Sequence, residues 1–443
     1  MSGQSPLSEP LRIGIVAGGG SLPVEIARSV EARGGFVHAV MIEGQAQGAL
    51  RTFSHTDASW AEVGKAIKSF KRAGIKDIVL VGRMVRPRFK TAKPDFGFLR
   101  SLPAVLRIFR AGGDDAVLRA VIEMFERRGL KVRGVGEVAP ELLVGDGPMT
   151  DLGPSETDDA DIALGMALIG ALGRHDIGQA AVISQGQIEA IEGAEGTDRM
   201  VARVAERRRL AAGDPLIRSR GVLIKRPKPG QDLRVDLPAI GPDTVQQVAD
   251  ARLSGIAAMS GYVLAASRFE LISAAERQRV FVAGVSDAMA QGALSAAAYR
   301  GDSSVDSDAL VFGGIDPQPA VLADIQRGMR IMSTLAEFGT GSALVIRKGR
   351  VYSIGAGESP VEVIERAAAF FKPSRKPSGV AVIGHRQALD DAIIDAAAVA
   401  GLEGLIVMYG REVRPQHHGA IVARADAAKL FIAGGQVTEA AAT

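Results

Sequence analysis

The chain contains no cysteine and a single tryptophan, Trp60, among its 443 residues. The absence of cysteine excludes disulfides, thiolate metal sites and cysteine nucleophiles. Aromatic residues make up 5% of the chain, too few for the stacking platforms that bind single-stranded nucleic acid. There is no apolar run of about 18 residues and no basic start followed by an apolar segment. We therefore expect a cytoplasmic protein that has no spanning helix and binds no nucleic acid.

Charge is nearly balanced, with 53 Lys and Arg against 50 Asp and Glu, a net +3. Basic residues are concentrated in Arg83–Lys93 and Arg203–Lys228. Such runs are usually solvated surfaces, and the alternative is contact with a phosphate or an anionic membrane surface. Apolar residues make up 47%, which is typical of a folded protein, and the length suggests two to four domains at roughly 100–200 residues each.

The first part of the chain alternates short apolar runs with segments of helical spacing. Strands are expected at Arg12–Ala17, Phe36–Ile42, Asp77–Val81 and Leu130–Gly134, and helices at Val24–Arg33, Trp60–Ala73 and Gly113–Arg128. This alternation favours a parallel sheet with helices on both faces. We predict a Rossmann-like α/β domain over residues 10–145, followed by a Gly-, Pro- and Asp-rich linker at 145–161.

A second module follows the linker and occurs twice. The segment starting at Asp161 recurs at Asp324 (324 − 161 = 163), and the hairpin AAVISQGQIEAI returns as SALVIRKGRVYSI. Further along, Gly255 matches Gly404 (404 − 255 = 149), so the second copy is shorter. Self-similarity at a fixed offset indicates an internal repeat. We predict an α/β catalytic domain at 155–284 and a degenerate copy of it at 285–436.

The shortening removes polar loops and keeps the helices and strands. The first copy has GAEGTD at 193–198 where the second has AGESPV, and it has KPGQDLRVDLPAIG at 228–241 where the second has a shorter gap. This pattern predicts that the second copy has lost its catalytic function and kept the packing of its core.

Three motifs are candidates for that chemistry. The glycine turn Gly18–Gly20 lies between a predicted strand and helix, where backbone amides can bind phosphate, although a tight turn explains it equally well. GAEGTD supplies Glu195, Thr197 and Asp198 for Mg²⁺ or phosphate, with a helix cap as the alternative.

The third motif is the loop KPGQDLRVDLPAIG, in which prolines exclude a helix. It carries mixed charges at Lys228, Asp232, Arg234 and Asp236, next to Lys225. A diphosphate substrate needs cations to offset its charge and a carboxylate to hold Mg²⁺ or orient water. An exposed, salt-bridged loop is the alternative. The adjacent His417 and His418 form no metal pattern and are expected on the surface.

These segments resemble the LpxI-type UDP-2,3-diacylglucosamine pyrophosphatase family of lipid A biosynthesis. The matching pieces, in order, are IVAGGGSLPVEIA, VGRMVRP, GDDAVLRAV, LGRHDIGQAAVI, EGTDRM and PKPGQDLRVDLPAIGPDTV, covering about Leu11 to Gly284. The resemblance implies Mg²⁺-dependent hydrolysis to UMP and 2,3-diacylglucosamine 1-phosphate. It also implies that the acylated UDP-sugar is bound between two domains.

The family's essential aspartate lies in an R-x-D-x-P segment, which here makes Asp236 the expected catalytic residue and metal ligand. Charge and spacing alone do not choose it over Asp232. On the matched segments we expect substrate binding by Gly18, Gly19, Gly20, Gln179, Glu195, Thr197, Asp198, Lys228, Asp232 and Arg234.

The tail after about residue 284 departs from the family. Its segments VIRKGRVYSIGAG and DAAAVAGLEGLIVMYGREVR resemble the formyltransferase half of the bifunctional purine-biosynthesis enzyme, but without that family's lysine–histidine segment. A non-catalytic scaffold or regulator built by duplication therefore stays open as an alternative, with a folate-linked formyltransferase less favoured. Peripheral contact with the inner membrane and a homo-oligomer are further expectations.

Overall fold

The computed structural model describes residues 11–83, 114–210, 220–296, 310–371, 376–409 and 419–436. They form two compact units. Unit 1 comprises the chain up to residue 146 together with 230–242 and 260–274, and unit 2 comprises 147–229, 243–259 and the chain from 275 onward. The chain thus enters unit 1 three times, whereas the boundaries drawn from the sequence were contiguous. The loop that carries Asp236 belongs to unit 1.

Unit 1 contains a five-stranded, fully parallel sheet in the order β3-β2-β1-β4-β5. Its strands are β1 (Arg12–Ala17), β2 (Phe36–Ile42), β3 (Ser54–Ala58), β4 (Asp77–Val81) and β5 (Lys131–Val132). The order reverses between β1 and β4, the position at which open α/β sheets bind ligands. The glycine turn follows β1 at this point.

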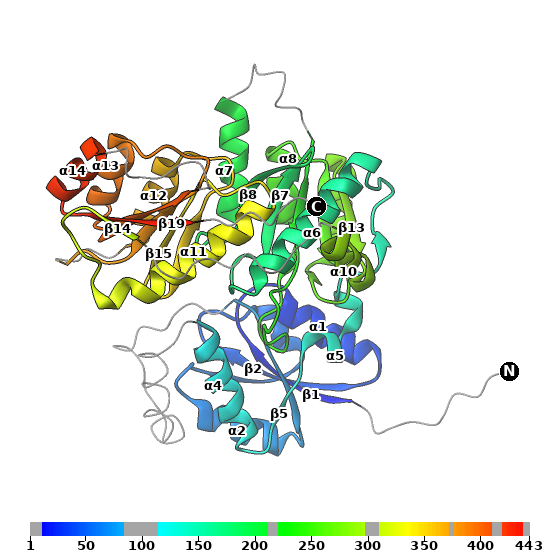
Figure 1. The fold of residues 1–443 in the computed structure, drawn as a ribbon. Coiled ribbons are helices and arrows are strands. Elements are labelled where there is room, and N and C mark those ends of the chain that lie inside the picture. Colours follow the sequence, from blue (N-terminus) through cyan, green and yellow to red (C-terminus); the bar gives the residue numbers. More distant parts are fainter. Residues whose placement is uncertain are drawn as a thin grey trace. The chain divides into compact units, whose positions relative to one another are not determined.

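Helices pack on both faces of the unit 1 sheet (Figure 1). They are α1 (Leu22–Ala32), α2 (Val63–Arg72), α4 (Asp114–Glu126) and α5 (Val135–Val138). One apolar cluster joins α1 and α5 to β1 through Ile13 and Ile15. A second cluster joins α2 and α4 around Phe70. Two short parallel strands, β10 (Ala239–Ile240) and β12 (Leu264–Ala265), bring the two later segments into this unit.

Unit 2 contains two six-stranded sheets with the same strand order. The first is β6-β13-β11-β9-β7-β8 and the second is β14-β19-β18-β17-β15-β16. In each sheet the last three strands of the copy run parallel, the hairpin is antiparallel to them, and the first strand is an antiparallel edge. The predicted fold class is therefore confirmed, including a second copy of the module.

The first lobe of unit 2 consists of β6 (Gly147–Pro148), α6 (Glu156–Gly173), β7 (Ala180–Ser184), β8 (Gln187–Ile191), α7 (Thr197–Leu210), β9 (Val222–Lys225), α8 (Pro242–Asp250), β11 (Gly255–Met259), α9 (Arg268–Gln278), β13 (Phe281–Val285) and α10 (Asp287–Ala296). The second lobe consists of β14 (Leu310–Phe312), α11 (Leu322–Glu337), β15 (Ala343–Arg347), β16 (Arg350–Ile354), α12 (Pro360–Ala368), β17 (Val380–Ile383), α13 (Asp391–Val399), β18 (Gly404–Tyr409), α14 (Gly419–Ala427) and β19 (Phe431–Gln436). Both lobes lie in unit 2, except for Pro242 at the start of α8 and Arg268–Ala274, the larger part of α9, which belong to unit 1.

The stretch predicted as a linker is partly ordered secondary structure. It contains β6 and the first turn of α6, which is capped by Ser155 and Asp158. The reciprocal hydrogen bonds of this capping box satisfy amides that the helix leaves open. Clustered Ser and Asp residues, which suggested a loop, are here the signal of a helix start.

A buried aspartate holds the hairpin turn in both lobes. Asp161 accepts from the amides of Gln185 and Gly186 at 2.8 and 2.6 Å. Asp324 accepts from the amides of Lys348 and Gly349 at 2.7 and 2.6 Å. Both turns have two central residues with positive φ, the geometry that favours glycine in two-residue hairpin loops.

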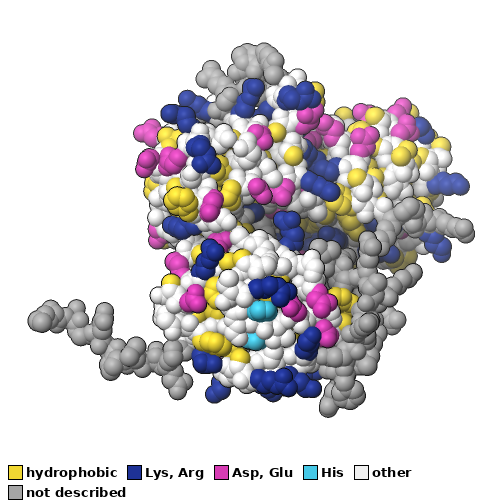
Figure 2. All heavy atoms as spheres, turned by 180° about the vertical axis from the view of Figure 1, so that it is seen from behind, with side chains coloured by type: hydrophobic (Ala, Val, Ile, Leu, Met, Phe, Trp, Pro, Cys, Tyr) yellow, Lys and Arg dark blue, Asp and Glu magenta, His cyan; other side chains and the backbone are white. Residues whose placement is uncertain are grey.

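No helix among the described residues combines the length and the apolar character needed to cross a bilayer. On the face shown in Figure 2, Lys and Arg side chains are interspersed with Asp and Glu. This mixture agrees with the small net charge.

Candidate active site

The glycine turn of unit 1 is tied to the end of β4. The amides of Gly18 and Gly19 donate to the carbonyls of Val81 and Arg83 at 2.9 and 2.8 Å. A Cβ on Gly18 would lie 2.7 Å from the Arg83 carbonyl oxygen, so the close approach of two backbones requires glycine there. Two of the three amides expected to bind phosphate are thus already occupied. Gly20 has φ +96° and open space around it.

The start of α1 next to this turn is joined to the third segment of unit 1. The Ser267 hydroxyl donates to the Ser21 hydroxyl at 3.1 Å, and the Ser267 amide donates to Glu25 at 2.9 Å. Ser267 follows β12, which pairs with β10 directly after the Asp236 segment. The glycine turn and the Asp236 loop are therefore parts of one packed unit.

Two of the predicted substrate-binding residues, Asp232 and Arg234, bind each other. Arg234 donates to the Asp232 carboxylate from Nε at 2.9 Å and from Nη2 at 2.7 Å, and its Nη1 donates to Glu126 at 3.0 Å. Hydrogen bonding from Arg234 lowers the pKa of Asp232. This fork keeps Asp232 ionised and occupied, so it is a poor candidate for the reacting carboxylate.

The backbone of Asp236 is fixed from two sides. Its amide donates to the Asp232 carbonyl at 3.0 Å, and its carbonyl accepts from Gln231 Nε2 at 2.6 Å. The flanking side chains are anchored as well, because Val235 packs against the α2 and α4 cluster and Leu237 against the α1 cluster. A half-buried carboxylate is thus presented from a loop that is held on both sides.

A cavity of about 550 Å³ lies beside this loop, within unit 1. Its lining includes charged groups on several segments, among them Arg119, Glu137, Asp232 and Arg234. Apolar surface comes from Leu143, Leu233, Leu237 and Tyr262. Asp236 is not among the lining residues, but its neighbour Leu237 is. The size is in the range of small-molecule sites.

A second polar group lies in unit 2, at the carboxyl edge of the parallel strands of the first lobe. Glu192 follows β8 and accepts from the Gln179 amide at 3.1 Å and from the Thr197 hydroxyl at 3.3 Å. Gln179 and Thr197, predicted from the sequence as binding residues, are thus brought together by a carboxylate that sequence reasoning missed. Nothing in the local sequence distinguished Glu192 from the other acids of the hairpin.

Lys225 ends β9 at the same edge and is only 8% exposed. Burial lowers the pKa of Lys225, opposed by the nearby charges of Glu192 and Asp198. Burial likewise raises the pKa of Glu192, opposed by Lys225. Buried charged side chains such as these are found mainly where they form ion pairs or take part in a functional site.

The second lobe lacks this group. Gly355 follows β16 where Glu192 follows β8, and Ile383 ends β17 where Lys225 ends β9. The carboxyl edge of open α/β sheets is where ligands bind. Of these two positions, Glu192 and Lys225 are charged in the first lobe and Gly355 and Ile383 are not in the second, which favours the first lobe as the place of the chemistry.

Two other predicted binding residues have structural partners. Glu195 is 3% exposed and forms ion pairs with Arg203 at 2.9 Å and Arg366 at 3.9 Å, which commits it to the contact between the two lobes. Lys228 pairs with Asp176 at 2.7 Å. These ion pairs give Glu195 a structural role, and its predicted contact with substrate stays a prediction.

Among the residues that the structure describes, no three Asp, Glu or His side chains converge to hold a metal ion. Three stretches named from the sequence lie outside that description, wholly or in part. They are the basic run after Arg83, residues 211–219 of the second basic run, and His417 with His418.

Comparison with known proteins decides the family. Residues 12–142 match the family model of the LpxI N-terminal domain, and residues 145–283 match that of the LpxI C-terminal domain. A protein of Caulobacter vibrioides named UDP-2,3-diacylglucosamine pyrophosphatase LpxI is 37% identical over 274 residues, which cover 62% of this chain and 97% of that protein. The chain belongs to the LpxI family.

Membership confirms the resemblance drawn from the sequence motifs and locates the departure from the family. Both LpxI domains end by residue 283, so the whole second lobe follows the part that family members share. The Asp236 loop lies within the LpxI C-terminal domain match, yet it packs in the unit that contains the LpxI N-terminal domain. The two compact units are thus interlaced along the chain, whereas the two family-model matches follow one another.

Proposed function

We propose that this protein hydrolyses the diphosphate of UDP-2,3-diacylglucosamine, releasing UMP and 2,3-diacylglucosamine 1-phosphate for lipid A biosynthesis. The observation that carries the proposal is the R-x-D-x-P loop. Backbone hydrogen bonds and core packing hold this loop beside a cavity of about 550 Å³. The chain also covers 97% of a relative that is named for this activity.

Asp236 is the proposed catalytic carboxylate. Hydrolysis requires a group that orients water toward phosphorus, and small misplacements of such a group reduce the rate strongly. Asp236 has its backbone fixed on both sides, whereas the Asp232 carboxylate is occupied by Arg234. The choice of Asp236 therefore rests on its position in the R-x-D-x-P loop and on the Arg234 fork that binds Asp232.

We propose Mg²⁺ as the cofactor, with Asp236 as a ligand. Mg²⁺ is usually held by one or two carboxylates together with substrate phosphates and water. A site without three converging acids among the described residues therefore fits an ion that arrives with the diphosphate. When bound, the ion would offset the negative charge of the diphosphate.

The cavity lining fits part of an acylated, anionic substrate. Arg119 supplies a cation, and Leu143, Leu233 and Leu237 from two segments of the chain supply apolar surface. Each CH₂ removed from water contributes about 0.8 kcal/mol. Because two acyl chains anchor such a substrate in a bilayer, we propose peripheral contact of the protein with the cytoplasmic face of the inner membrane.

The test is release of UMP from UDP-2,3-diacylglucosamine by the purified chain, with Mg²⁺ and with chelator. Asp236→Asn keeps the size and removes the charge, and we expect roughly a 10²- to 10⁴-fold loss of rate. Asp243→Asn, an exposed aspartate that follows the same loop, is the matched control and should keep full activity. A folded wild-type chain that releases no UMP would favour the non-catalytic scaffold instead.

A further inference from the structure

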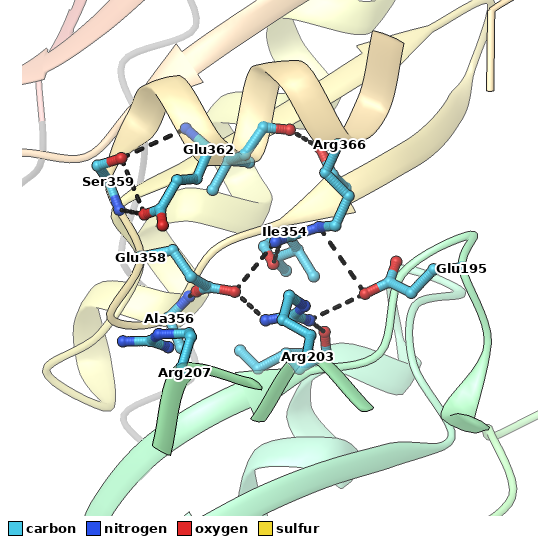
Figure 3. A network of polar contacts seen from close by, with 12 residues as sticks. Glu195, Arg203, Arg207, Ile354, Ala356, Glu358, Ser359, Glu362 and Arg366 are labelled. Carbon is cyan, nitrogen blue, oxygen red and sulfur yellow. Dashed lines mark hydrogen bonds and ion pairs between the residues drawn. The ribbon is translucent and has the colours of Figure 1, made fainter. Parts of the chain in front are cut away.

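Four buried charges connect the two lobes of unit 2 (Figure 3). Arg203 of α7 pairs with Glu195 of its own lobe at 2.9 Å and with Glu358 of the other lobe. Arg366 of α12 pairs with Glu358 of its own lobe at 3.1 Å and with Glu195 of the other at 3.9 Å. Each arginine thus contacts one carboxylate in each lobe.

These residues are equivalent in the repeat. The offset of 163 positions that relates Asp161 to Asp324 also relates Glu195 to Glu358 and Arg203 to Arg366. Both arginine side chains are 14% exposed, and both glutamates are nearly inaccessible, at 3% and 1%. Exchanging the two lobes therefore reproduces the set of ion pairs, although Arg203 also donates a hydrogen bond to Glu358 and Arg366 makes its contact with Glu195 at 3.9 Å without one.

Backbone contacts obey the same exchange. Arg203 Nη2 donates to the Ile191 carbonyl at 3.4 Å, and Arg366 Nη2 donates to the Ile354 carbonyl at 2.8 Å. Ile191 and Ile354 are again equivalent, as the last residues of β8 and β16. In both arginines the Nε atom is buried without a hydrogen-bond partner.

The apolar part of the contact is also made by equivalent elements. Helices α6 and α11, which carry Asp161 and Asp324, pack against each other. Met166, Ile169, Met329 and Met332 belong to one continuous buried cluster that extends through both sheets. A shared core of this kind is typical of obligate subunit interfaces.

Contacts of this kind define an isologous interface, in which one surface meets a second copy of itself. In a solenoid, by contrast, each repeat uses two different surfaces to contact its neighbours. We propose that the first lobe carries a self-association surface whose partner is a second copy of the same module. The second lobe occupies the place of that second subunit, so the chain is a covalently joined dimer of modules.

The differences between the lobes support this assignment. The second lobe has lost the Glu192 and Lys225 equivalents but kept Glu358 and Arg366. Removing one member of a buried ion pair leaves an unpaired buried charge, so these four residues are constrained together. A lobe retained for its surface keeps such residues whether or not it binds a ligand.

The decisive experiment is a pair of double-mutant cycles in the full chain, measured by urea denaturation. One cycle combines Arg203→Met with Glu358→Gln, and the other combines Arg366→Met with Glu195→Gln. Each single substitution should reduce the folded-to-unfolded ratio by roughly a hundredfold or more. A self-complementary surface predicts coupling of the same sign in both cycles, equal within about threefold. Coupling in one cycle without the other would overturn the proposal.

Where a methionine variant does not fold, Arg203→Lys and Arg366→Lys replace it, because lysine keeps the charge and loses the bidentate fork. The two lysine variants should shift the urea midpoint by equal amounts. A shift confined to one of them would contradict equivalence of the two arginines.

A second measurement uses the mass of the assembly. A chain ending at residue 296 retains both LpxI domain matches, which end by residue 283, and omits the second lobe. We expect this shorter chain to sediment as a dimer, and Arg203→Glu within it to give a monomer. A folded monomer without that substitution would refute the self-association surface.

Discussion

The Thr197 hydroxyl donates to the Glu192 carboxylate at 3.3 Å and joins the first turn of α7 to the end of β8. In the second lobe the equivalent positions are Pro360 and Gly355, which cannot form this bond. The pair lies at the edge where Lys225 is buried. The first lobe therefore has a hydrogen-bonded polar pair at this strand edge. The equivalent positions of the second lobe lack that pair and allow a direct comparison within one chain.

We expect Lys225→Met to reduce UMP release by at least about tenfold, because a buried cation that contacts the substrate phosphates would stabilise developing negative charge. Ile383→Met, at the equivalent position of the second lobe, is the matched control and should leave the rate unchanged. The assay is steady-state UMP release at saturating substrate.

The double variant Lys225→Met with Glu192→Gln separates activity from stability. Removing both charges should recover most of the stability that Lys225→Met loses, because no unpaired charge remains. Activity should stay low. Recovery of both quantities together would assign the pair a purely structural role.

Asp232 and Asp236 are predicted to differ in their effect on the reaction. Asp232→Asn removes the charge and one of the two oxygens that accept from Arg234, and we expect roughly a tenfold loss of kcat/KM, which is the loss of one charged hydrogen bond. Asp236→Asn should be at least ten times more severe. Equal losses would show that the two carboxylates act as one unit.

Much of the fold could be predicted from the sequence. Strands β1, β2 and β4 have the predicted bounds, because each is a short apolar run bounded by turn residues. Strand β3 was missed, since its sequence SHTDA is polar and lies at the edge of the sheet, where only one neighbour pairs with it.

The candidate site was predictable only in part. The R-x-D-x-P segment named Asp236, but its packing with unit 1 depends on β10 and β12, strands of two residues that no periodicity reveals. Glu195 looked like a ligand residue because it stands in a glycine-rich loop. Its partner Arg366 is 171 positions away (366 − 195 = 171), a distance over which no local pattern operates.

The hairpin aspartates are predicted to stabilise both lobes equally. Asp161→Asn and Asp324→Asn each replace one acceptor oxygen by a donor that faces a turn amide. We expect a loss of about 1–3 kcal/mol in the free energy of unfolding for each variant. Asp159→Asn, an exposed position on α6, is the control and should change stability by less than about 1 kcal/mol. Thermal or urea unfolding measures all three.

Stability should fall in mild acid because of His175. Burial, assisted by Arg174, Arg327 and Arg330, lowers the pKa of His175 from the ordinary 6.5 to about 4. Between these values the unfolded chain takes up a proton that the folded chain does not, so the free energy of unfolding decreases as the pH falls from about 6.5 to about 4. The neutral ring contributes its full stability above this window.

His175→Gln should flatten that part of the pH profile. The variant retains a polar group near the Thr334 hydroxyl, which lies 2.9 Å from the His175 ring. Urea denaturation at intervals from pH 7.5 to 4.5 measures the slope, with His55→Gln in unit 1 as the control. Identical slopes for the wild type and His175→Gln would exclude this histidine as the cause.

Both halves of the lobe contact are encoded on one polypeptide, and this changes how the contact responds to dilution. A contact between separate subunits weakens as the protein becomes scarce, whereas a tethered one has a fixed effective concentration. Tethering also lets the halves vary independently, since a substitution in one half is no longer repeated in the other. This chain can therefore accept a substitution that only one half tolerates. A symmetric dimer of identical subunits cannot, because the substitution would occur in both subunits.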